Sequence, residues 1–257
     1  MKTVILCGGL GTRLSEETNQ IPKPMVKIGD KPILFHIMNF FSYSNYNEFI
    51  LCAGYKSVEI KKYFLEYNLE KQNIYLDFKK KKTIIEKKYF PNWKMNIVQT
   101  GELSQTAARI KKIKKYIKND NDFFMTYGDG LSNVDLKKLL KFHKSHGKIA
   151  TVTACRPVAR FGNITLVGDK VSKFIEKDHL SEGWVNGGFF VLNKKIFDYI
   201  DNNEQRIFER EPLENLAKKG QLMAYKHEGF WHPMDTLRDK NILSELIKKN
   251  IAPWIKN

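Results

Sequence analysis

The chain has 257 residues, enough to bury one large hydrophobic core but not several, so we expect a single domain over residues 1–257. No apolar run approaches the roughly 18 residues that a membrane helix needs, and the run at the N-terminus is too short for a secretory signal, which predicts a cytoplasmic protein with no membrane partner. The net charge of +16 comes mostly from lysine, in runs without a nucleic-acid-binding motif, so we expect solvated faces, no nucleic-acid partner and long-range attraction of a small anionic ligand.

The first part of the chain alternates between short apolar runs and segments with helical spacing. Residues 73–98 are less regular and contain two strand-like pieces, at 74–78 and 84–85, before a clearer strand. Strands and helices that alternate at this spacing predict a parallel sheet with helices on both faces. The strands are expected at residues 4–6, 49–52, 95–98, 123–125 and 149–155, and the helices at 32–41, 58–67, 106–118 and 136–146.

Beyond residue 155 the pattern changes, and strand-like pieces crowd together. The chain has neither a clean linker nor an internal repeat. We therefore expect an α/β fold: a single αβα domain with a Rossmann-like, mostly parallel mixed sheet and a β-rich C-terminal extension of that sheet. The later strands are expected at residues 164–167, 171–175, 185–192 and 222–225, and the later helices at 212–219 and 236–249.

Residues 7–24 (CGGLGTRLSEETNQIPKP) follow the first strand and combine features that suit a polyphosphate. Three glycines lack Cβ atoms, so backbone N–H groups can approach an anion closely. Arg13 adds a planar charged fork, and Lys23 adds a compact charge between two prolines that restrict its backbone. The stretch is neither a Walker A loop nor a dinucleotide fingerprint. For the glycines alone, a plain turn after a strand is an equally weighted interpretation.

Two aspartates stand at expected element ends. Asp129 lies in YGDG directly after the strand at 123–125, and Asp235 directly precedes the helix at 236–249. Each alone has a structural interpretation, as a turn residue or a helix N-cap. Beside a phosphate-binding loop they gain meaning, because Mg²⁺ prefers one or two carboxylates plus substrate phosphates. We expect them at the carboxyl ends of neighbouring strands, where open α/β sheets place ligands.

Cysteines and histidines predict no further metal site. Cys7, Cys52 and Cys155 are far apart and include no CxxC pair, so we expect buried reduced thiols rather than a zinc site or a disulfide. The histidines form no spaced cluster, and we interpret them as structural: His36, His143, His146, His179, His227 and His232.

The combination GGLGTRL…PKP resembles the signature of the sugar-nucleotidyltransferase family, and SEET at residues 15–18 resembles its glucose-1-phosphate cytidylyltransferase branch. RPVARFG (156–162), VNGGFFVLN (185–193) and GFWHPMDTLRDK (229–240) are similar to the same branch, so the resemblance covers essentially the whole chain. It implies a Mg²⁺-dependent enzyme that joins CTP to α-D-glucose 1-phosphate and releases pyrophosphate. The product, CDP-glucose, would be used to make the dideoxyhexoses of surface polysaccharides such as O-antigen.

The resemblance also implies a homo-oligomer, a hexamer, with residues 1–155 as the nucleotide-binding half and 156–257 as the sugar-binding half. Arg13 and the loop amides would bind the departing pyrophosphate as Lys23 neutralises the α-phosphate; Arg13 and Lys23 are thus the implied catalytic residues, and Asp129 and Asp235 the metal ligands. The implied nucleotide-binding residues are Leu6, Cys7, Gly8, Gly9, Leu10, Gly11, Thr12, Arg13, Lys23, Ser104, Thr106, Arg109 and Gly128. The implied sugar-phosphate residues are Glu176, Lys177, Asn186 and Gly187, and Gly188 would line the sugar beside them.

Two departures from the branch pattern bear on specificity. Asp178 follows Glu-Lys where a proline is usual, and Ala107-Ala108 stand where Gly-Gly is usual before Arg109. We expect Arg109 to donate to O2 and N3 of cytosine, which uracil, with a hydrogen on N3, could not both accept. The competing interpretation of Arg109 is a basic residue on a solvated helix face.

Other functions stay open at this point. Within the same reaction class, the enzyme could use UTP, dTTP or a different sugar 1-phosphate. Outside it, the chain could be a non-catalytic nucleotide-sensing module, which would predict the loss of Arg13, Lys23 or Asp129. All three residues are present, so the sequence favours the enzyme.

Overall fold

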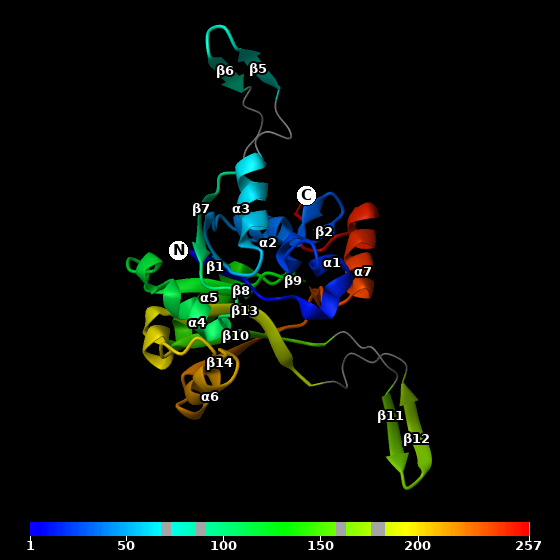
Figure 1. The fold of residues 1–257 in the computed structure, drawn as a ribbon. Helices are drawn as coiled ribbons and strands as arrows, with labels where there is room; N and C mark the ends of the chain where they lie inside the picture. The colour runs from blue at the N-terminus through cyan, green and yellow to red at the C-terminus, as the bar shows by residue number, and fades with distance from the viewer. Residues whose placement is uncertain (68–72, 86–90, 158–162, 176–182, 257) are drawn as a thin grey trace.

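A seven-stranded sheet forms the centre of the molecule (Figure 1). The computed structural model describes residues 1–67, 73–85, 91–157, 163–175 and 183–256. In spatial order the strands are β14 (Leu222–His227), β10 (Ala150–Cys155), β13 (Val185–Asn193), β8 (Asp122–Tyr127), β1 (Thr3–Cys7), β4 (Glu48–Ala53) and β7 (Lys94–Gln99).

The sheet is mixed, and most of its pairs are parallel. Strand β1 runs parallel to β4 and β8, β4 is parallel to β7, and β10 is parallel to β14. Only β13 runs against its neighbours, pairing antiparallel with both β8 and β10. Because β13 and β14 follow residue 155 in the chain, the later residues extend the sheet of the earlier ones, which confirms the expected single mixed-sheet α/β domain.

Helices cover both faces of the sheet. Alternate residues of β1 enter different cores: Ile5 packs in one cluster, and Val4 in the other. The cluster around Ile5 is covered by α2 (Ile33–Ser42), α3 (Ser57–Glu66), α5 (Leu136–His146) and α7 (Leu237–Lys248). The cluster around Val4 is covered by α4 (Thr106–Lys112), α6 (Glu211–Lys218) and the 3₁₀ helices η3 (Lys114–Tyr116) and η4 (Lys194–Tyr199).

The helix expected over residues 106–118 is divided in two. Helix α4 ends at Lys112, where the Ile113 N–H bonds the Ile110 carbonyl at 3.2 Å in a tighter 3₁₀ turn that continues into η3. Ile113 and Ile117 stay buried in the core, so packing preserves the apolar face while the backbone changes its winding.

Two hairpins stand away from the body of the molecule (Figure 1). They are β5 (Ile74–Asp77) with β6 (Lys82–Ile85), and β11 (Asn163–Val167) with β12 (Lys170–Ile175). The sequence places strands here correctly, but these strands do not join the central sheet, so β13 and β14 alone extend it. Large apolar side chains are exposed on both hairpins, including Phe78 at 86% and Val167 at 69%. No described helix is long and apolar enough to cross a membrane.

A buried histidine of α5, His143, lies beside the first residue of β8, and its burial predicts a pH-dependent stability. His143 Nδ1 lies 2.8 Å from the Thr151 hydroxyl, and burial lowers the pKa of His143 from its ordinary 6.5 despite the nearby Asp122 carboxylate. Below pH 6.5 the unfolded chain therefore binds a proton that the folded chain does not, and the free energy of unfolding falls, by up to about 1.4 kcal/mol per pH unit for this one group.

We expect the urea midpoint to fall more between pH 7.5 and pH 5.5 in the wild type than in His143→Asn, which keeps a polar group near Thr151 but does not titrate. An equal fall in both proteins would show that His143 does not carry this dependence.

Candidate active site

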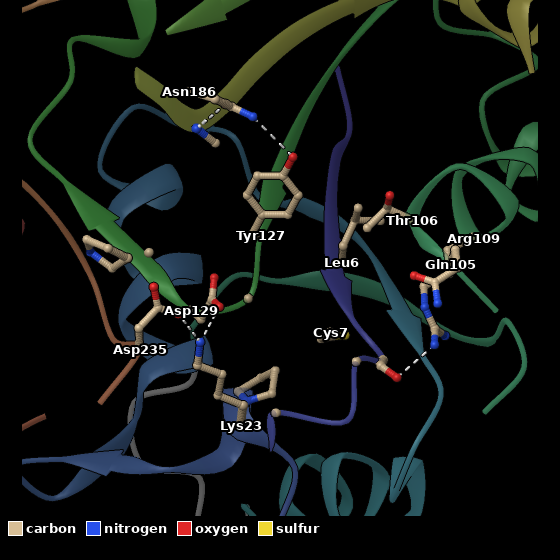
Figure 2. Close-up of a pocket in the computed structure, with 18 of the residues that line it drawn as sticks. Leu6, Cys7, Lys23, Gln105, Thr106, Arg109, Tyr127, Asp129, Asn186 and Asp235 are labelled. Carbon is tan, nitrogen blue, oxygen red and sulfur yellow. Dashed lines mark hydrogen bonds and ion pairs between the residues drawn. The ribbon is translucent and has the colours of Figure 1, made fainter. Parts of the chain in front are cut away.

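A pocket of about 550 Å³ lies at the carboxyl ends of β1 and β8 (Figure 2). It brings together residues that are far apart in the sequence, from the glycine loop to the last helix. The predicted site residues that line it are Leu6, Cys7, Gly8, Gly9, Gly11, Thr12, Lys23, Ser104, Thr106, Arg109, Gly128, Asp129, Asn186, Gly187, Gly188 and Asp235.

Four predicted residues are not among those that line the pocket in the described part of the chain. Leu10 is 45% exposed and is not among the residues that line the pocket. Arg13 belongs to the short 3₁₀ helix η1 (Thr12–Leu14), followed by α1 (Ser15–Thr18), and only its backbone is described. Glu176 and Lys177, with Asp178 and His179 beside them, fall outside the described residues.

The sequence also missed residues that line the pocket. Most of these lie within two positions of a predicted residue, so proximity to the motifs was the available signal. Trp231 lies four residues before Asp235, inside the stretch GFWHPMDTLRDK, and its indole donates to the Gly187 carbonyl at 2.7 Å. The additional lining residues are Pro24, Gln105, Tyr127, Gly130, Trp231 and Pro233.

The glycine loop needs its glycines at two positions. A Cβ on Gly8 would lie 2.2 Å from Nη1 of Arg109, so only glycine lets the loop approach this guanidinium. Gly11 has a φ of +68°, which disfavours any side chain, and its carbonyl accepts from the Thr18 hydroxyl. The interpretation of these glycines as a plain turn is therefore incomplete, because Gly8 is needed for close packing and Gly11 for its backbone conformation.

Lys23 lies between the two predicted metal ligands (Figure 2). It begins the 3₁₀ helix η2 (Lys23–Met25) and is buried. Its ammonium donates to Asp129 at 2.6 Å and to Asp235 at 2.8 Å. Burial acts to lower the pKa of Lys23, but the two carboxylates outweigh it and hold that pKa above its ordinary value. One ammonium thus pairs with both aspartates in this structure and offsets half of their combined charge.

Asp235 lies beside Asp129 because of a strand pairing that the sequence did not predict. The two residues do not follow neighbouring strands of the central sheet. Strand β9 (Gly130–Ser132), directly after Asp129, pairs with β15 (Trp231–Pro233), directly before Met234 and Asp235. The Met234 N–H bonds the Asp129 carbonyl at 2.8 Å. A separate two-stranded ribbon therefore aligns the two aspartates.

The start of α7 fixes the backbone at Asp235. Thr236, not Asp235, is the N-cap, and it forms a capping box with Asp239. The Asp239 carboxylate accepts from the Asp235 N–H at 3.1 Å and lies 3.1 Å from His232 Nε2. The structural alternative for Asp235 is thus wrong, while His232 has the structural role expected for it. A small ribbon, β2 (Lys27–Ile28) with β3 (Lys31–Pro32), contacts the same helix.

The paired aspartates fit a hard divalent cation. Carboxylate oxygens of both lie within 2.8 Å of one ammonium nitrogen, so they converge on a single position that already holds positive charge. No group of three or more His, Cys, Asp or Glu side chains among the described residues could hold a metal ion by itself. A cation here would complete its shell with water and the phosphates of a ligand.

Arg109 is buried, which contradicts the interpretation as a solvated helix residue. It is 3% exposed, and its guanidinium donates to the carbonyls of Gly8 at 2.7 Å and Gly101 at 2.7 Å and to the Thr100 hydroxyl at 2.8 Å. Arg109 therefore holds the glycine loop against the segment after β7. Contact with a base would require some of these bonds to be exchanged.

The cysteines are buried free thiols, as expected. Burial raises the pKa of Cys7 and of Cys155 to about 12, and it raises that of Cys52 well above its ordinary value. These thiols are therefore protonated and poor nucleophiles at neutral pH, so the pocket offers no cysteine chemistry.

The pocket brings together a glycine loop at a strand end, a buried lysine and two converging carboxylates, an arrangement that suits a metal-bound polyphosphate. The model of one protein family, described as Nucleotidyl transferase, matches residues 2–239, most of the chain and every part of this pocket. The chain belongs to the nucleotidyl transferase family.

Relatives within this family match nearly the full chain. The glucose-1-phosphate cytidylyltransferase of Salmonella typhi is 48% identical over 254 residues, covering 99% of this chain and 98% of the relative. The probable glucose-1-phosphate cytidylyltransferase of Bacillus subtilis (strain 168) is 47% identical over 255 residues, covering 99% of each. The crystal structure of HddC from Yersinia pseudotuberculosis is similar with a TM-score of 0.71 at 26% identity, covering 96% of this chain and 99% of that one. The fold and the pocket thus belong to one nucleotidyl transferase unit.

Proposed function

We propose that this nucleotidyl transferase joins CTP to α-D-glucose 1-phosphate and releases pyrophosphate, as a glucose-1-phosphate cytidylyltransferase. The observation that carries the proposal is the 47–48% identity over nearly the whole chain to relatives of that name. The pocket supports it, because about 550 Å³ is a size typical of small-ligand sites and the lining holds both cationic and anionic groups.

The phosphates of CTP are proposed to lie along the glycine loop. An oxygen of the sugar phosphate would attack the α-phosphorus in line with the departing pyrophosphate, so the protein acts mainly by positioning and by neutralising charge. Arg13 and the loop amides would bind the pyrophosphate. Lys23 would exchange its carboxylate partners for the α-phosphate, from a place in the pocket that already holds it beside the reacting groups.

Nucleotidyl transferases generally use a divalent metal, and we propose that Asp129 and Asp235 hold Mg²⁺ here. When bound, the ion would neutralise phosphate oxygens and help to orient them. Two carboxylates with no third His, Cys, Asp or Glu ligand among the described residues suit Mg²⁺, which retains water and substrate oxygens in its shell.

The sugar phosphate is proposed to lie near Asn186 and Gly187, at the start of β13. For Glu176 and Lys177, the proposed contacts rest on the sequence motif. The division into a nucleotide half at 1–155 and a sugar half at 156–257 also stays a proposal.

We further propose a homo-oligomer, with the hexamer that the family resemblance implies. The exposed apolar side chains of the two hairpins support association between copies. A cytoplasmic location and a role in dideoxyhexose synthesis for surface polysaccharides are predictions from the sequence.

Arg109→Ala is expected to reduce the preference for CTP over UTP. If Arg109 donates to O2 and N3 of cytosine, and a carbonyl from residues 6–8 accepts from the 4-amino group, mismatches with uracil amount to a preference on the order of a hundredfold. The measurement is the ratio of kcat/KM for the two triphosphates in wild type, Arg109→Ala and the exposed control Lys115→Ala. An unchanged ratio in Arg109→Ala would leave Arg109 only its role in holding the loop.

The proposed function is tested by pyrophosphate release from CTP, UTP, dTTP and GTP, each with several sugar 1-phosphates. We expect CTP with α-D-glucose 1-phosphate to give the highest kcat/KM. A higher value with UTP or dTTP, or with another sugar, would support the alternatives within the reaction class. No turnover with any pair, together with tight nucleotide binding, would support a nucleotide-sensing module.

A further inference from the structure

Residues 203–210, between η4 and α6, support the nucleotide side of the pocket from outside. The carbonyls of Glu204 and Arg206 accept from the N–H groups of Gln105 at 2.9 Å and Ala107 at 3.0 Å. These N–H groups belong to the beginning of α4, where a helix leaves its own donors without partners, and the N-cap Gln105 makes no side-chain cap. The 203–210 segment therefore supplies the acceptors that this helix start lacks.

Glu209 is the member of this segment that reaches two walls of the pocket at once. Its Oε2 accepts from the Thr106 hydroxyl at 2.6 Å, and its Oε1 accepts from the Tyr127 hydroxyl. Thr106 lies at the start of α4 and Tyr127 at the end of β8, and Figure 2 shows both beside the pocket. Glu209 itself is not among the residues that line the pocket, so it can act only through these two hydroxyls.

The bonds to Glu209 fix how each hydroxyl can interact with a ligand. Thr106 donates to Glu209 and accepts from the Phe208 N–H at 2.8 Å, which holds its rotamer. Tyr127 also donates to Glu209, so its oxygen can act toward the pocket only as an acceptor. Burial and the neighbouring carboxylate raise the pKa of Tyr127 far above its ordinary value, so the phenol keeps its proton.

The acceptor side of Tyr127 faces the side of the pocket proposed for the sugar. Asn186 Nδ2 lies 3.5 Å from the Tyr127 oxygen, a long contact that a better donor could replace (Figure 2). A hydroxyl of a sugar phosphate is such a donor, whereas a phosphate oxygen is not.

We propose that Glu209 is a positioning residue that links the two substrate sides: it fixes Thr106 beside the nucleotide and turns the Tyr127 hydroxyl into an acceptor for a sugar hydroxyl. The inference rests on the proposed function for the assignment of the two sides. One carboxylate with two acceptor oxygens suits this role, because an amide of the same shape offers only one acceptor.

Glu209→Ala, which removes both acceptor oxygens, is therefore expected to raise KM for both substrates, by about tenfold each, as loss of one hydrogen bond at each side predicts. Tyr127→Phe should raise KM for the sugar phosphate alone, and Thr106→Val should raise KM for the triphosphate alone. In the Tyr127→Phe background, Glu209→Ala should no longer raise KM for the sugar phosphate but should still raise KM for the triphosphate. In the Thr106→Val background, Glu209→Ala should raise KM for the sugar phosphate but no longer raise KM for the triphosphate.

Glu214→Ala is the matched control, since Glu214 is an exposed glutamate of α6 outside the pocket lining, and it should leave both KM values unchanged. The proposal is overturned if Glu209→Ala behaves like this control, or if it raises both KM values equally in all backgrounds, as a general distortion of the pocket would. If Glu209→Ala does not fold, Tyr127→Phe is the deciding variant, because an unchanged sugar-phosphate KM in that variant contradicts the proposal.

The kinetics are measured with the triphosphate and sugar phosphate that wild type uses best. A best pair other than CTP and α-D-glucose 1-phosphate would refute the proposed function, and the background-dependent pattern would still test Glu209.

Discussion

Asp129→Asn and Asp235→Asn are each expected to abolish turnover while the fold survives. Each carboxylate supplies part of the anionic charge that converges on one position in the pocket, and an amide of the same shape supplies none. Loss of a group that stabilises charge in the transition state predicts a fall in kcat/KM on the order of a thousandfold or more.

The rates are measured at saturating Mg²⁺, and Mn²⁺ binding in the presence of CTP is followed by electron paramagnetic resonance as a second readout. Asp30→Asn, which changes a carboxylate outside the pocket lining, is the control and should match the wild type in both. Near-normal activity in either pocket variant would contradict the assignment of both aspartates to the metal.

Lys23→Ala is expected to lower kcat/KM by on the order of a hundredfold or more, because it removes a charged donor and leaves two carboxylates facing each other. Lys23→Arg should not restore activity. The planar guanidinium is larger than an ammonium, and the buried position between Asp129 and Asp235 suits a compact charge. A Lys23→Ala enzyme with unchanged kcat and KM would show that this residue does not take part.

The same ion pairs predict a second effect of Lys23 that does not depend on turnover. Since the ammonium lies where the two carboxylates converge, it competes with a divalent cation in the absence of nucleotide. Lys23→Met should therefore bind Mn²⁺ alone more tightly than the wild type, with a larger rise in Tm on addition of the metal. Equal metal affinity in the two proteins would contradict this competition.

Hydrophobic patterns within single helices and strands predicted most of the fold. The apolar runs at 4–6, 49–52 and 123–125 became the adjacent parallel strands β1, β4 and β8, because each run is buried on both faces and is too short for a helix. What the pattern could not show was which strands would lie outside the central sheet: the sequence predicts strands at both β11 and β13, but only β13 pairs with β8. Pairing depends on contacts between distant residues, and a single sequence does not contain them.

Site residues that belong to a sequence motif could be predicted. Contacts that depend on the three-dimensional arrangement of distant residues could not. Lys23, Asp129 and Asp235 were identified singly, but their mutual ion pairs follow from the β9–β15 ribbon, whose strands are only three residues long. Glu209 was missed because it serves the pocket through other side chains, and no motif marks such a residue. The burial of Arg109 could not be predicted, because the neighbouring lysines are typical of a solvated helix face.

A competition experiment gives the most direct test of whether this enzyme makes CDP-glucose. Equimolar CTP, UTP, dTTP and GTP are supplied together with α-D-glucose 1-phosphate and Mg²⁺, and the nucleotide sugars formed at early times are identified by mass spectrometry. We expect CDP-glucose to be the dominant product, in excess over UDP-glucose on the order of a hundredfold. Predominance of UDP-glucose or dTDP-glucose would contradict it.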